Sequence, residues 1–409
     1  MADSSVFRRR VYHLGGYDHA QPEVVHGRFV REARRFERVW AASAVSSEAT
    51  NSDDVSTWQV CTTGPNWRVE TEYCAIRWDD VVEATNRRPM WWRIPQGLLA
   101  FVDFTLAGAL WGYLRASWRY AMFFLYPFLI LAVIAALSLA GGAALARATD
   151  SSTLGTVAAI GAFLLLFLAA DRWVYLGLLF DDWIFARQYI RRGDPILEGR
   201  LQRMAADLVE AQRRGSADEI LIVGHSLGAV LAIDLIDHAM KLGLGEQDGC
   251  PRLAFLSVGS STLKIGLHRA ASRFRAAVGR VSSCRAVLWA DYQARSDVMN
   301  FYRADPLPLM GLAATGSPVI RSVSIRRMID PARYPRIRRN WYRMHCQFVR
   351  GNDRRAPYDY FMFVCGPLYA EQLVNSKEGA MQALDADGRF RDTHSPALTG
   401  DHSTEVAKR

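Results

Sequence analysis

Apolar positions form several patterns along the chain, and the longest apolar runs lie in the middle of the sequence. Tyr120 to Ala146 and Ser151 to Ala170 carry no charged residue. Each run is as long as the ~20 residues that a helix needs to cross the apolar core of a bilayer. The connection from Arg147 to Asp150 is short and polar. We therefore predict a hairpin of two membrane-spanning helices, at about 120–146 and 151–170.

On both sides of this hairpin, short apolar runs alternate with segments that have helical apolar spacing. The predicted strands are residues 9–14, 69–78, 219–223, 253–258, 286–289 and 319–325; the predicted helices are 23–40, 195 to about 215, 268–278 and 358–373; residues 41–56 are a predicted loop. This alternation favours an α/β fold with a doubly wound, mostly parallel sheet, interrupted by the transmembrane hairpin. Functional groups in such a fold lie at the carboxyl ends of the strands.

A further apolar segment precedes the hairpin. Ile94 to Tyr113 is apolar apart from Gln96 and Asp103, and it follows Trp91-Trp92. We expect a helix that lies in the membrane interface, with the tryptophans at headgroup depth and Asp103 turned outward. If this segment crossed the membrane instead, the two soluble parts would face opposite compartments and the predicted sheet would be split.

Arginine residues flank the hairpin on both sides. Arg115 and Arg119 precede it and Arg187, Arg191 and Arg192 follow it, whereas the connecting loop contains only Arg147. Because loops rich in Lys and Arg stay on the cytoplasmic side, both soluble parts are predicted to face the cytoplasm. We expect a multi-pass protein of the bacterial inner membrane.

Composition narrows the classes of partner. The formal net charge of +9 is carried largely by arginine, which favours contact with the anionic headgroups of a lipid bilayer. The arginines are dispersed and no nucleic-acid-binding module is visible, so no nucleic-acid partner is expected. The cysteines (Cys61, Cys74, Cys250, Cys284, Cys346 and Cys365) include no C-x-x-C pair, which favours free thiols in a reducing compartment.

A strand, a sharp turn and a helix are predicted around Gly224-His225-Ser226-Leu227-Gly228. Apolar residues 219–223 precede the turn and apolar residues 229–233 follow it. A glycine two residues before and after the serine removes the Cβ atoms that would collide where strand and helix meet. The hydroxyl of Ser226 would stand exposed above the sheet, where the first amides of the helix also point. The pattern is typical of a nucleophilic serine, and a serine that only caps the helix is the alternative.

With this G-H-S-L-G turn the chain resembles the α/β-hydrolase superfamily, and within it the lipase and esterase branch. The resemblance covers the two soluble parts and excludes the hairpin. It implies that Ser226 is the nucleophile of a serine hydrolase and that the acid and then the histidine follow it along the chain.

The serine needs a base to take its proton, and the base needs a carboxylate to orient it. Asp297, in a loop just after a predicted strand, matches the position that the resemblance gives to the acid; Asp291, closer to the strand end, is the alternative. His345 lies between the last predicted strand and the closing helix, as the resemblance implies for the base. His394, in the polar C-terminal segment, is the alternative.

The resemblance also implies an oxyanion hole. It would use the backbone N–H of Leu227 and an amide from the loop that contains Gly15 and Gly16, where glycine lets the main chain approach the substrate carbonyl. The sequence His13-Leu14-Gly15-Gly16 departs from the H-G-G-G pattern of some esterases, so the identity of the second donor stays open. The expected reaction requires no metal and no other cofactor.

These predictions divide the chain into parts. Residues 1–93 and 181–380 would form the hydrolase domain, 94–118 the interfacial helix, 119–180 the transmembrane hairpin and 381–409 a polar tail without fixed structure. The expected activity is that of a membrane-anchored serine esterase that cleaves a lipid or other acyl ester through an acyl-serine intermediate. The alternatives are an acyltransferase that uses the same residues, and a catalytically degenerate hydrolase fold that acts as a membrane-tethered binding or scaffold module.

Overall fold

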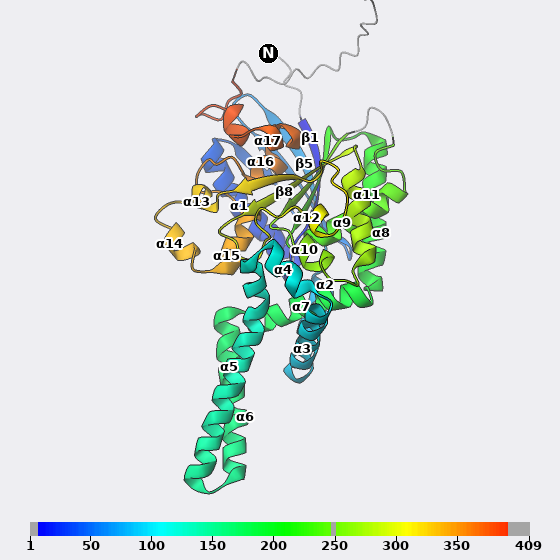
Figure 1. Cartoon of the computed structure of the whole chain (residues 1–409). Coiled ribbons are helices and arrows are strands. Elements are labelled where there is room, and N and C mark those ends of the chain that lie inside the picture. The colour runs from blue at the N-terminus through cyan, green and yellow to red at the C-terminus, as the bar shows by residue number, and fades with distance from the viewer. Residues whose placement is uncertain (1–6, 247–250, 392–409) are drawn as a thin grey trace, which may run out of the picture.

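A mostly parallel sheet forms the centre of the protein, as described for residues 7–246 and 251–391 by a computed structural model (Figure 1). Its strands are β1 (Phe7–Leu14), β2 (Ser43–Ser46), β3 (Thr50–Asn51), β4 (Val55–Thr63), β5 (Arg68–Ile76), β6 (Glu219–His225), β7 (Arg252–Val258), β8 (Val287–Ala294) and β9 (Val319–Val323). The spatial order is β2-β4-β5-β1-β6-β7-β8-β9, and β3 pairs with β4. All pairings from β5 to β9 in this order are parallel, whereas β2, β3 and β4 form an antiparallel end.

Helices fill the connections between these strands. They are α1 (Pro22–Trp40), α2 (Asp79–Asn86), α3 (Met90–Leu106), α4 (Ala109–Ala116), α5 (Trp118–Thr149), α6 (Ser152–Val174), α7 (Leu176–Arg191), α8 (Pro195–Arg214), α9 (Gly228–Lys241), α10 (Thr262–Gly266), α11 (Ser272–Ser283), α12 (Pro306–Leu309), α13 (Ile325–Met328), α14 (Tyr334–Ile337), α15 (Trp341–Cys346), α16 (Tyr360–Cys365) and α17 (Ala370–Asn375), with short 3-10 helices η1 (Gln347–Val349) and η2 (Gly379–Gln382).

Strand β6 shows why helices cover both faces of the sheet. Successive side chains of a strand point to opposite faces, and every residue of β6 is buried. Ile220 and Ile222 belong to the apolar core that includes residues of α8, α9 and α11. Leu221 and Val223 belong to the core that includes residues of α1, α16 and α17. The sheet is therefore a middle layer between two helical layers, as the alternating pattern predicts.

The carboxyl ends of the parallel strands point toward the hairpin of α5 and α6. In Figure 1 the start of β1, in dark blue, lies at the end of the sheet farthest from this hairpin. Since β1 is parallel to β5 and β6, the loops that follow these strands lie on the hairpin side. A site at the strand ends therefore faces the segment that is expected in the membrane.

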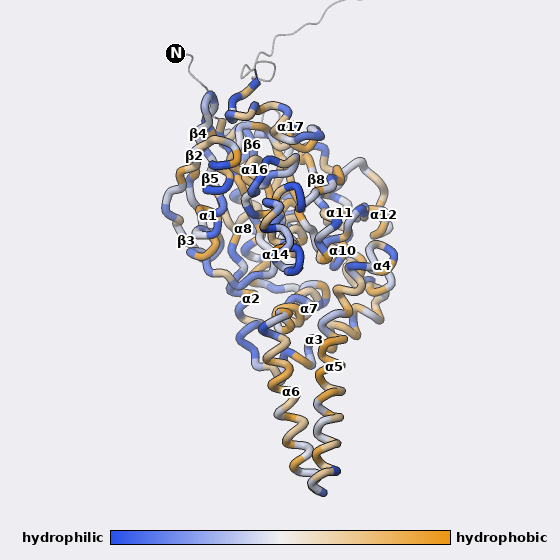
Figure 2. The backbone as a smooth tube through the Cα atoms, turned by 90° about the vertical axis from the view of Figure 1, so that its left-hand side faces the viewer, coloured by the Kyte–Doolittle hydropathy of each residue, from blue (hydrophilic) through white to orange (hydrophobic). Residues whose placement is uncertain are grey.

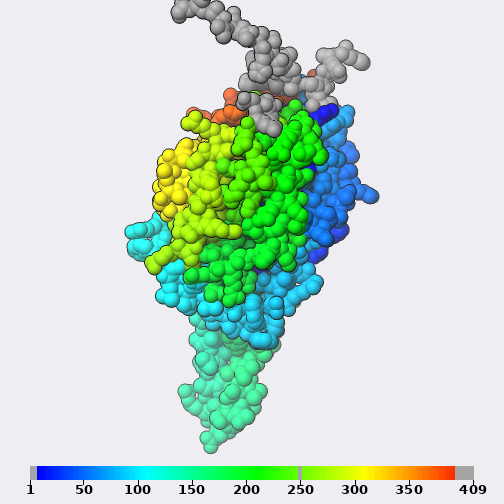
Figure 3. All heavy atoms as spheres, turned by 90° about the vertical axis from the view of Figure 1, so that its right-hand side faces the viewer, coloured from blue at the N-terminus to red at the C-terminus, as the bar shows by residue number. Residues whose placement is uncertain are grey.

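Two described helices, α5 and α6, are long and apolar enough to cross a membrane. They lie side by side and project from the globular part as a narrow apolar stalk (Figures 2 and 3). At their contact, a Cβ on Gly142 would meet the carbonyl oxygen of Gly155, so glycine permits this close packing. The predicted spans, 120–146 and 151–170, are confirmed as helices of this kind.

The segment predicted as a single interfacial helix, 94–118, contains two helices. α3 and α4 meet at an angle of 70° at Gly108, which has a φ of +80°, a conformation that glycine adopts without strain. Taken as one bent unit, the pair is also long and apolar enough to be a broken span or a re-entrant segment. Trp91 and Leu106 at the two ends of α3 are exposed, so this helix presents apolar side chains to its surroundings.

The prediction that Asp103 turns outward is wrong. Its carboxylate accepts hydrogen bonds from Arg187 Nε (3.1 Å) and Arg191 Nε (3.0 Å) of α7, and only 12% of its side chain is exposed. His268 Nε2, in the segment after α10, lies 3.7 Å from the same carboxylate. A largely buried carboxylate is stable only with such partners, so Asp103 fastens α3 to the globular part.

Three other predictions differ from the structure. Residues 41–56 are not a loop, because β2, β3 and the start of β4 lie there; β2 is short and only half-buried, so it lacks a strong apolar alternation. The predicted helix 358–373 is divided into α16 and α17. Residues 381–391 of the predicted tail are packed, since Leu384 is buried and Gly388 O accepts a hydrogen bond from Trp67 Nε1 (2.8 Å). The remainder, 392–409, lies outside the described residues.

Candidate active site

The chain turns sharply between β6 and α9, as Gly224 and Gly228 in the sequence predict. Ser226, at the apex, has a φ of +56°, in the left-handed region that residues with a Cβ rarely adopt. A Cβ on Gly224 would collide with the backbone of Ala229, and one on Gly228 would collide with carbonyl oxygens of the loop after β1. The two glycines therefore allow α9 to start close to the strands.

Hydrogen bonds hold the strained backbone of Ser226 on both sides. Its N–H donates to Val258 O at the end of β7 (3.1 Å), and its carbonyl oxygen accepts from the N–H groups of Ala229 and Ser261 (3.1 Å each). Because both neighbouring elements fix this residue, its hydroxyl has a defined position above the end of the sheet. Ser226 Oγ lies 3.4 Å from Ser261 Oγ.

Gly228 offers a direct test of this packing. We expect Gly228→Ala to lower the free energy of unfolding by about 3 kcal/mol, because the new Cβ would overlap the carbonyl oxygens of Leu14 and Gly15. Gly27→Ala is the matched control: Gly27 is exposed in α1, and no atom lies within 4 Å of the place where an added Cβ would sit, so this change should stabilise the protein by up to about 1 kcal/mol. Thermal unfolding of both variants in detergent measures the difference, and equal effects would contradict the packing.

Asp297 lies in the loop after β8, and hydrogen bonds within the loop set its position. β8 continues to Ala294, beyond the predicted end at Trp289. Asn300 Nδ2 donates to the carbonyl oxygens of Ala294 and Asp297 (2.8 Å each), which closes the loop. The Met299 N–H donates to Asp297 Oδ1 (2.9 Å). The other carboxylate oxygen, Oδ2, is thereby left for a second donor.

His345, in α15, provides that donor. The helix begins after Asn340, whose side chain accepts a hydrogen bond from the Arg343 N–H (2.8 Å). His345 Nδ1 lies 2.7 Å from Asp297 Oδ2, and the two side chains are 3% and 0% exposed. A carboxylate on Nδ1 selects the tautomer in which Nδ1 carries the proton and Nε2 can accept one.

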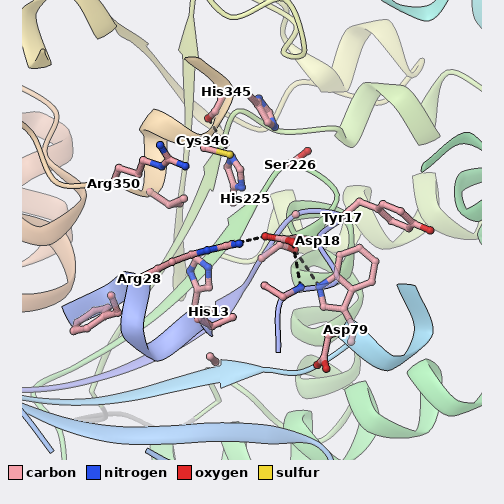
Figure 4. A pocket seen from close by; sticks show the side chains of 18 of the residues that line it. His13, Tyr17, Asp18, Arg28, Asp79, His225, Ser226, His345, Cys346 and Arg350 are labelled. Atoms are coloured by element: carbon pink, nitrogen blue, oxygen red, sulfur yellow. Dashed lines mark hydrogen bonds and ion pairs between the residues drawn. The ribbon is translucent and has the colours of Figure 1, made fainter. Parts of the chain in front are cut away.

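The structure brings Ser226, His345 and Asp297 to the same end of the sheet and pairs the last two. Ser226 and His345 line one cavity (Figure 4). His345 Nε2 is buried and has no hydrogen-bond partner among the described residues. Ser226 Oγ pairs with Ser261 Oγ (3.4 Å). The hydrogen bond between serine and histidine often becomes short only when substrate is bound.

The two alternative residues do not complete this arrangement in the described part of the chain. Asp291 lies inside β8, where its carboxylate accepts hydrogen bonds from Ser257 Oγ (2.5 Å) and Gln293 Nε2 (2.6 Å). Burial raises the pKa of Asp291 to about 6. It therefore belongs to the interior of the sheet and does not line the cavity at Ser226. His394 lies outside the described residues.

The loop after β1 covers Ser226. A Cβ on Gly16 would lie 3.0 Å from Ser226 Cβ, so glycine permits this close approach. The carbonyl oxygen of Gly15 accepts a hydrogen bond from Trp78 Nε1 (3.2 Å). Neither the Gly16 N–H nor the Leu227 N–H donates to another described residue. Both N–H groups are therefore available to an oxygen atom bound above Ser226.

His225 is a site residue that the sequence analysis did not assign. Its ring lies against that of His345, with 4.6 Å between the ring centroids, and its Nε2 donates to the carbonyl oxygen of His345 (3.2 Å). Burial, together with the nearby His345, lowers the pKa of His225 well below its ordinary value. It is thus a neutral ring that holds α15 against the turn. In the sequence, the only indication that His225 belongs to the site is its position directly before Ser226.

A cavity of about 210 Å³ opens in front of Ser226. Its aromatic and apolar lining includes Phe29, Trp58, Tyr73, Trp78, Leu178, Leu179, Trp341 and Phe361. His13 also lines it, with Nδ1 3.1 Å from the hydroxyl of Tyr360. Burial lowers the pKa of His13 to about 4, so this ring is neutral at pH 7. A mostly apolar cavity with a few polar groups suits an organic ligand.

The first turns of α5 pack against the loop that carries Asp297 and the helix that carries His345. Tyr120 stacks on Phe301, in the loop after β8, with 3.9 Å between the ring centroids. Phe123 contacts Trp341 of α15 edge to face at 5.4 Å. The apolar hairpin is therefore part of the support of the site and not a separate anchor.

Comparisons with protein-family models, with curated proteins and with solved structures found no match to this chain.

Proposed function

We propose that the chain is a membrane-anchored serine hydrolase of the α/β-hydrolase type that cleaves carboxylic esters through an acyl-serine intermediate. The observation that carries this proposal is the 2.7 Å contact between His345 Nδ1 and Asp297 Oδ2, beside a serine held at positive φ. A histidine that has a buried carboxylate on one nitrogen and no partner on the other is suited to act as a general base.

The residues support the following reaction. Ser226 Oγ attacks the ester carbon while its proton passes to His345 Nε2, and Asp297 stabilises the resulting imidazolium. The N–H groups of Leu227 and Gly16 donate to the negatively charged oxygen, and one such donor typically contributes ~3 kcal/mol. His345 then gives the proton to the departing alcohol, which leaves the acyl group on Ser226. Water, deprotonated by His345, releases the acid and restores the serine.

A binding module with a degenerate hydrolase fold is the other class of function. Such a module would not need a buried Asp297–His345 pair beside a cavity that reaches Ser226. The contact between Asp297 and His345, beside a cavity that also includes Ser226, therefore favours the enzyme.

The position of the site favours a substrate at the membrane surface. The strand ends face the hairpin (Figure 1), and the cavity is lined by Leu178 and Leu179 of α7, the helix that follows the hairpin. Trp118 and Trp173, at the ends of the hairpin next to the globular part, are 65% and 80% exposed. Tryptophan is enriched where the bilayer meets water. We infer that the cavity lies near the lipid headgroups and accepts a lipid or other acyl ester.

Ester hydrolysis by the purified full-length chain in detergent tests the proposal. With a 4-nitrophenyl acyl ester we expect a burst of nitrophenol close to one equivalent per enzyme molecule when deacylation is slower than acylation, followed by a steady rate. Mass spectrometry of the quenched protein should then find the acyl group on the peptide that contains Ser226. A chain that hydrolyses no ester and carries no acyl group would contradict the proposal.

The proposed cytoplasmic orientation gives a separate prediction. The arginines before and after the hairpin outnumber the single Arg147 near its tip, so the tip should lie outside the cytoplasm. A membrane-impermeant thiol reagent should label Asp150→Cys in intact cells and should label Lys377→Cys, on the exposed surface of the globular part, only after lysis. The reverse pattern would overturn the orientation.

A further inference from the structure

The charged side chains that line the cavity are nearly all paired. Its acidic residues are Asp18, Glu32, Asp79 and Asp182. Each has a cation of its own: Arg28 for Asp18, Arg35 for Glu32, Arg77 for Asp79 and Lys264 for Asp182. Of the arginines in the lining, Arg31 is also within 3.8 Å of Glu32. The acidic groups of the cavity are therefore already neutralised by neighbours.

Arg350 is the exception among the described residues. It follows η1, lines the cavity and is half-buried, and no hydrogen bond or ion pair of its guanidinium to another described residue is present. Figure 4 shows its guanidinium beside Cys346 and His225, in the part of the cavity next to the nucleophile turn. An arginine in a partly closed cavity would gain most from an anion that comes with the ligand, because no protein carboxylate offsets its charge.

We propose that Arg350 binds an anionic oxygen group, phosphate or carboxylate, that the substrate carries close to its ester. This inference rests on the proposed function and names its substrate class as acidic esters. A guanidinium is suited to the role, since its planar donors can bind two oxygens of one phosphate or carboxylate at once. The aromatic wall of the same cavity would hold the apolar part of the substrate, while Ser226 faces the ester carbon.

The electrostatic effect of Arg350 on its surroundings agrees with this position. Its positive charge contributes to the lowered pKa of His225, after burial and the neighbouring histidines. It also opposes the rise that burial causes in the pKa of Cys346, which reaches about 11. Both groups lie next to the catalytic histidine in sequence or in space. The guanidinium of Arg350 is therefore close enough to both groups to affect their pKa values.

The test compares matched acidic and neutral esters on the full-length protein in a nonionic detergent. One pair is the 4-nitrophenyl monoester of glutaric acid and 4-nitrophenyl valerate, which differ in a terminal carboxylate. The other pair is lysophosphatidic acid and monoacylglycerol with the same acyl chain, which differ in the phosphate. For Arg350→Gln we expect the ratio of kcat/KM, acidic over neutral, to fall about 10- to 100-fold in at least one pair.

Controls separate this inference from the proposed function. Arg343→Gln removes an exposed arginine of α15 and should leave both kcat/KM ratios within about two-fold of the wild-type values. Arg350→Lys should show a smaller fall in these ratios than Arg350→Gln, because it keeps the charge. A fall only in the lipid pair assigns the phosphate, and a fall only in the glutarate pair assigns the carboxylate. Unchanged ratios in Arg350→Gln, or an equal fall in Arg343→Gln, would overturn the inference while ester hydrolysis by the wild type stands. Absence of hydrolysis by the wild type would overturn both.

Discussion

Replacing Ser226 with alanine is expected to abolish ester hydrolysis, with kcat falling by about 10⁵-fold or more. A fluorophosphonate probe should label the wild type and not this variant, because the probe bonds covalently to an activated serine oxygen. Alanine at this position keeps the Cβ and the backbone that has a φ of +56°. The variant should therefore remain folded, which its thermal unfolding in detergent can verify.

Ser261→Ala is the matched control. Ser261 is as buried as Ser226, at 5% and 7% exposure, and its Oγ is 3.4 Å from Ser226 Oγ. Its φ is −94°, however, and it does not lie at the apex of a strand-to-helix turn. We expect Ser261→Ala to retain probe labelling at a rate within a few-fold of the wild type. If Ser261→Ala loses the label and Ser226→Ala keeps it, the nucleophile is Ser261.

The turn at Ser226 could be predicted from the sequence because its determinants are local. Gly224 and Gly228 are required by contacts within a few residues and with the loop after β1, and the apolar runs around them have clear strand and helix patterns. The two spans were predictable for a similar reason, since length and apolarity alone decide whether a helix can cross a membrane.

The choice between Asp297 and Asp291 could not be made from the sequence alone. The pattern placed the end of β8 at Trp289, whereas pairing with β7 and β9 extends the strand to Ala294. This extension puts Asp291 inside the sheet, whereas Asp297 stays in the loop, as predicted. The sequence also could not predict the partners of Asp103 or the contact of His225 with His345. These contacts join segments that are distant along the chain and meet only through the packing of the fold.

A second large effect is expected for Asp297→Asn, with kcat lower by about 10⁴-fold. Asparagine keeps the volume of aspartate but does not stabilise a positively charged His345 ring, and its amide favours the tautomer with the proton on Nε2. Asp291→Asn is the control. The carboxylate of Asp291 bonds to Ser257 and Gln293, so its replacement should change kcat by no more than a few-fold. A large loss in Asp291→Asn with little loss in Asp297→Asn would reverse the assignment of the acid.

The role of His345 can be tested by combining its replacement with that of Ser226. In the proposed reaction Ser226 and His345 act in one proton transfer, so once either is absent the other has nothing left to contribute. We expect Ser226→Ala, His345→Ala and the double variant to lose similar amounts of kcat, whereas independent residues would show losses that multiply. Steady-state rates with a 4-nitrophenyl ester distinguish the two results. If His345→Ala retains turnover and His394→Ala does not, the base lies in the C-terminal segment, and the pairing of His345 with Asp297 at 2.7 Å serves the stability of α15 instead of the reaction.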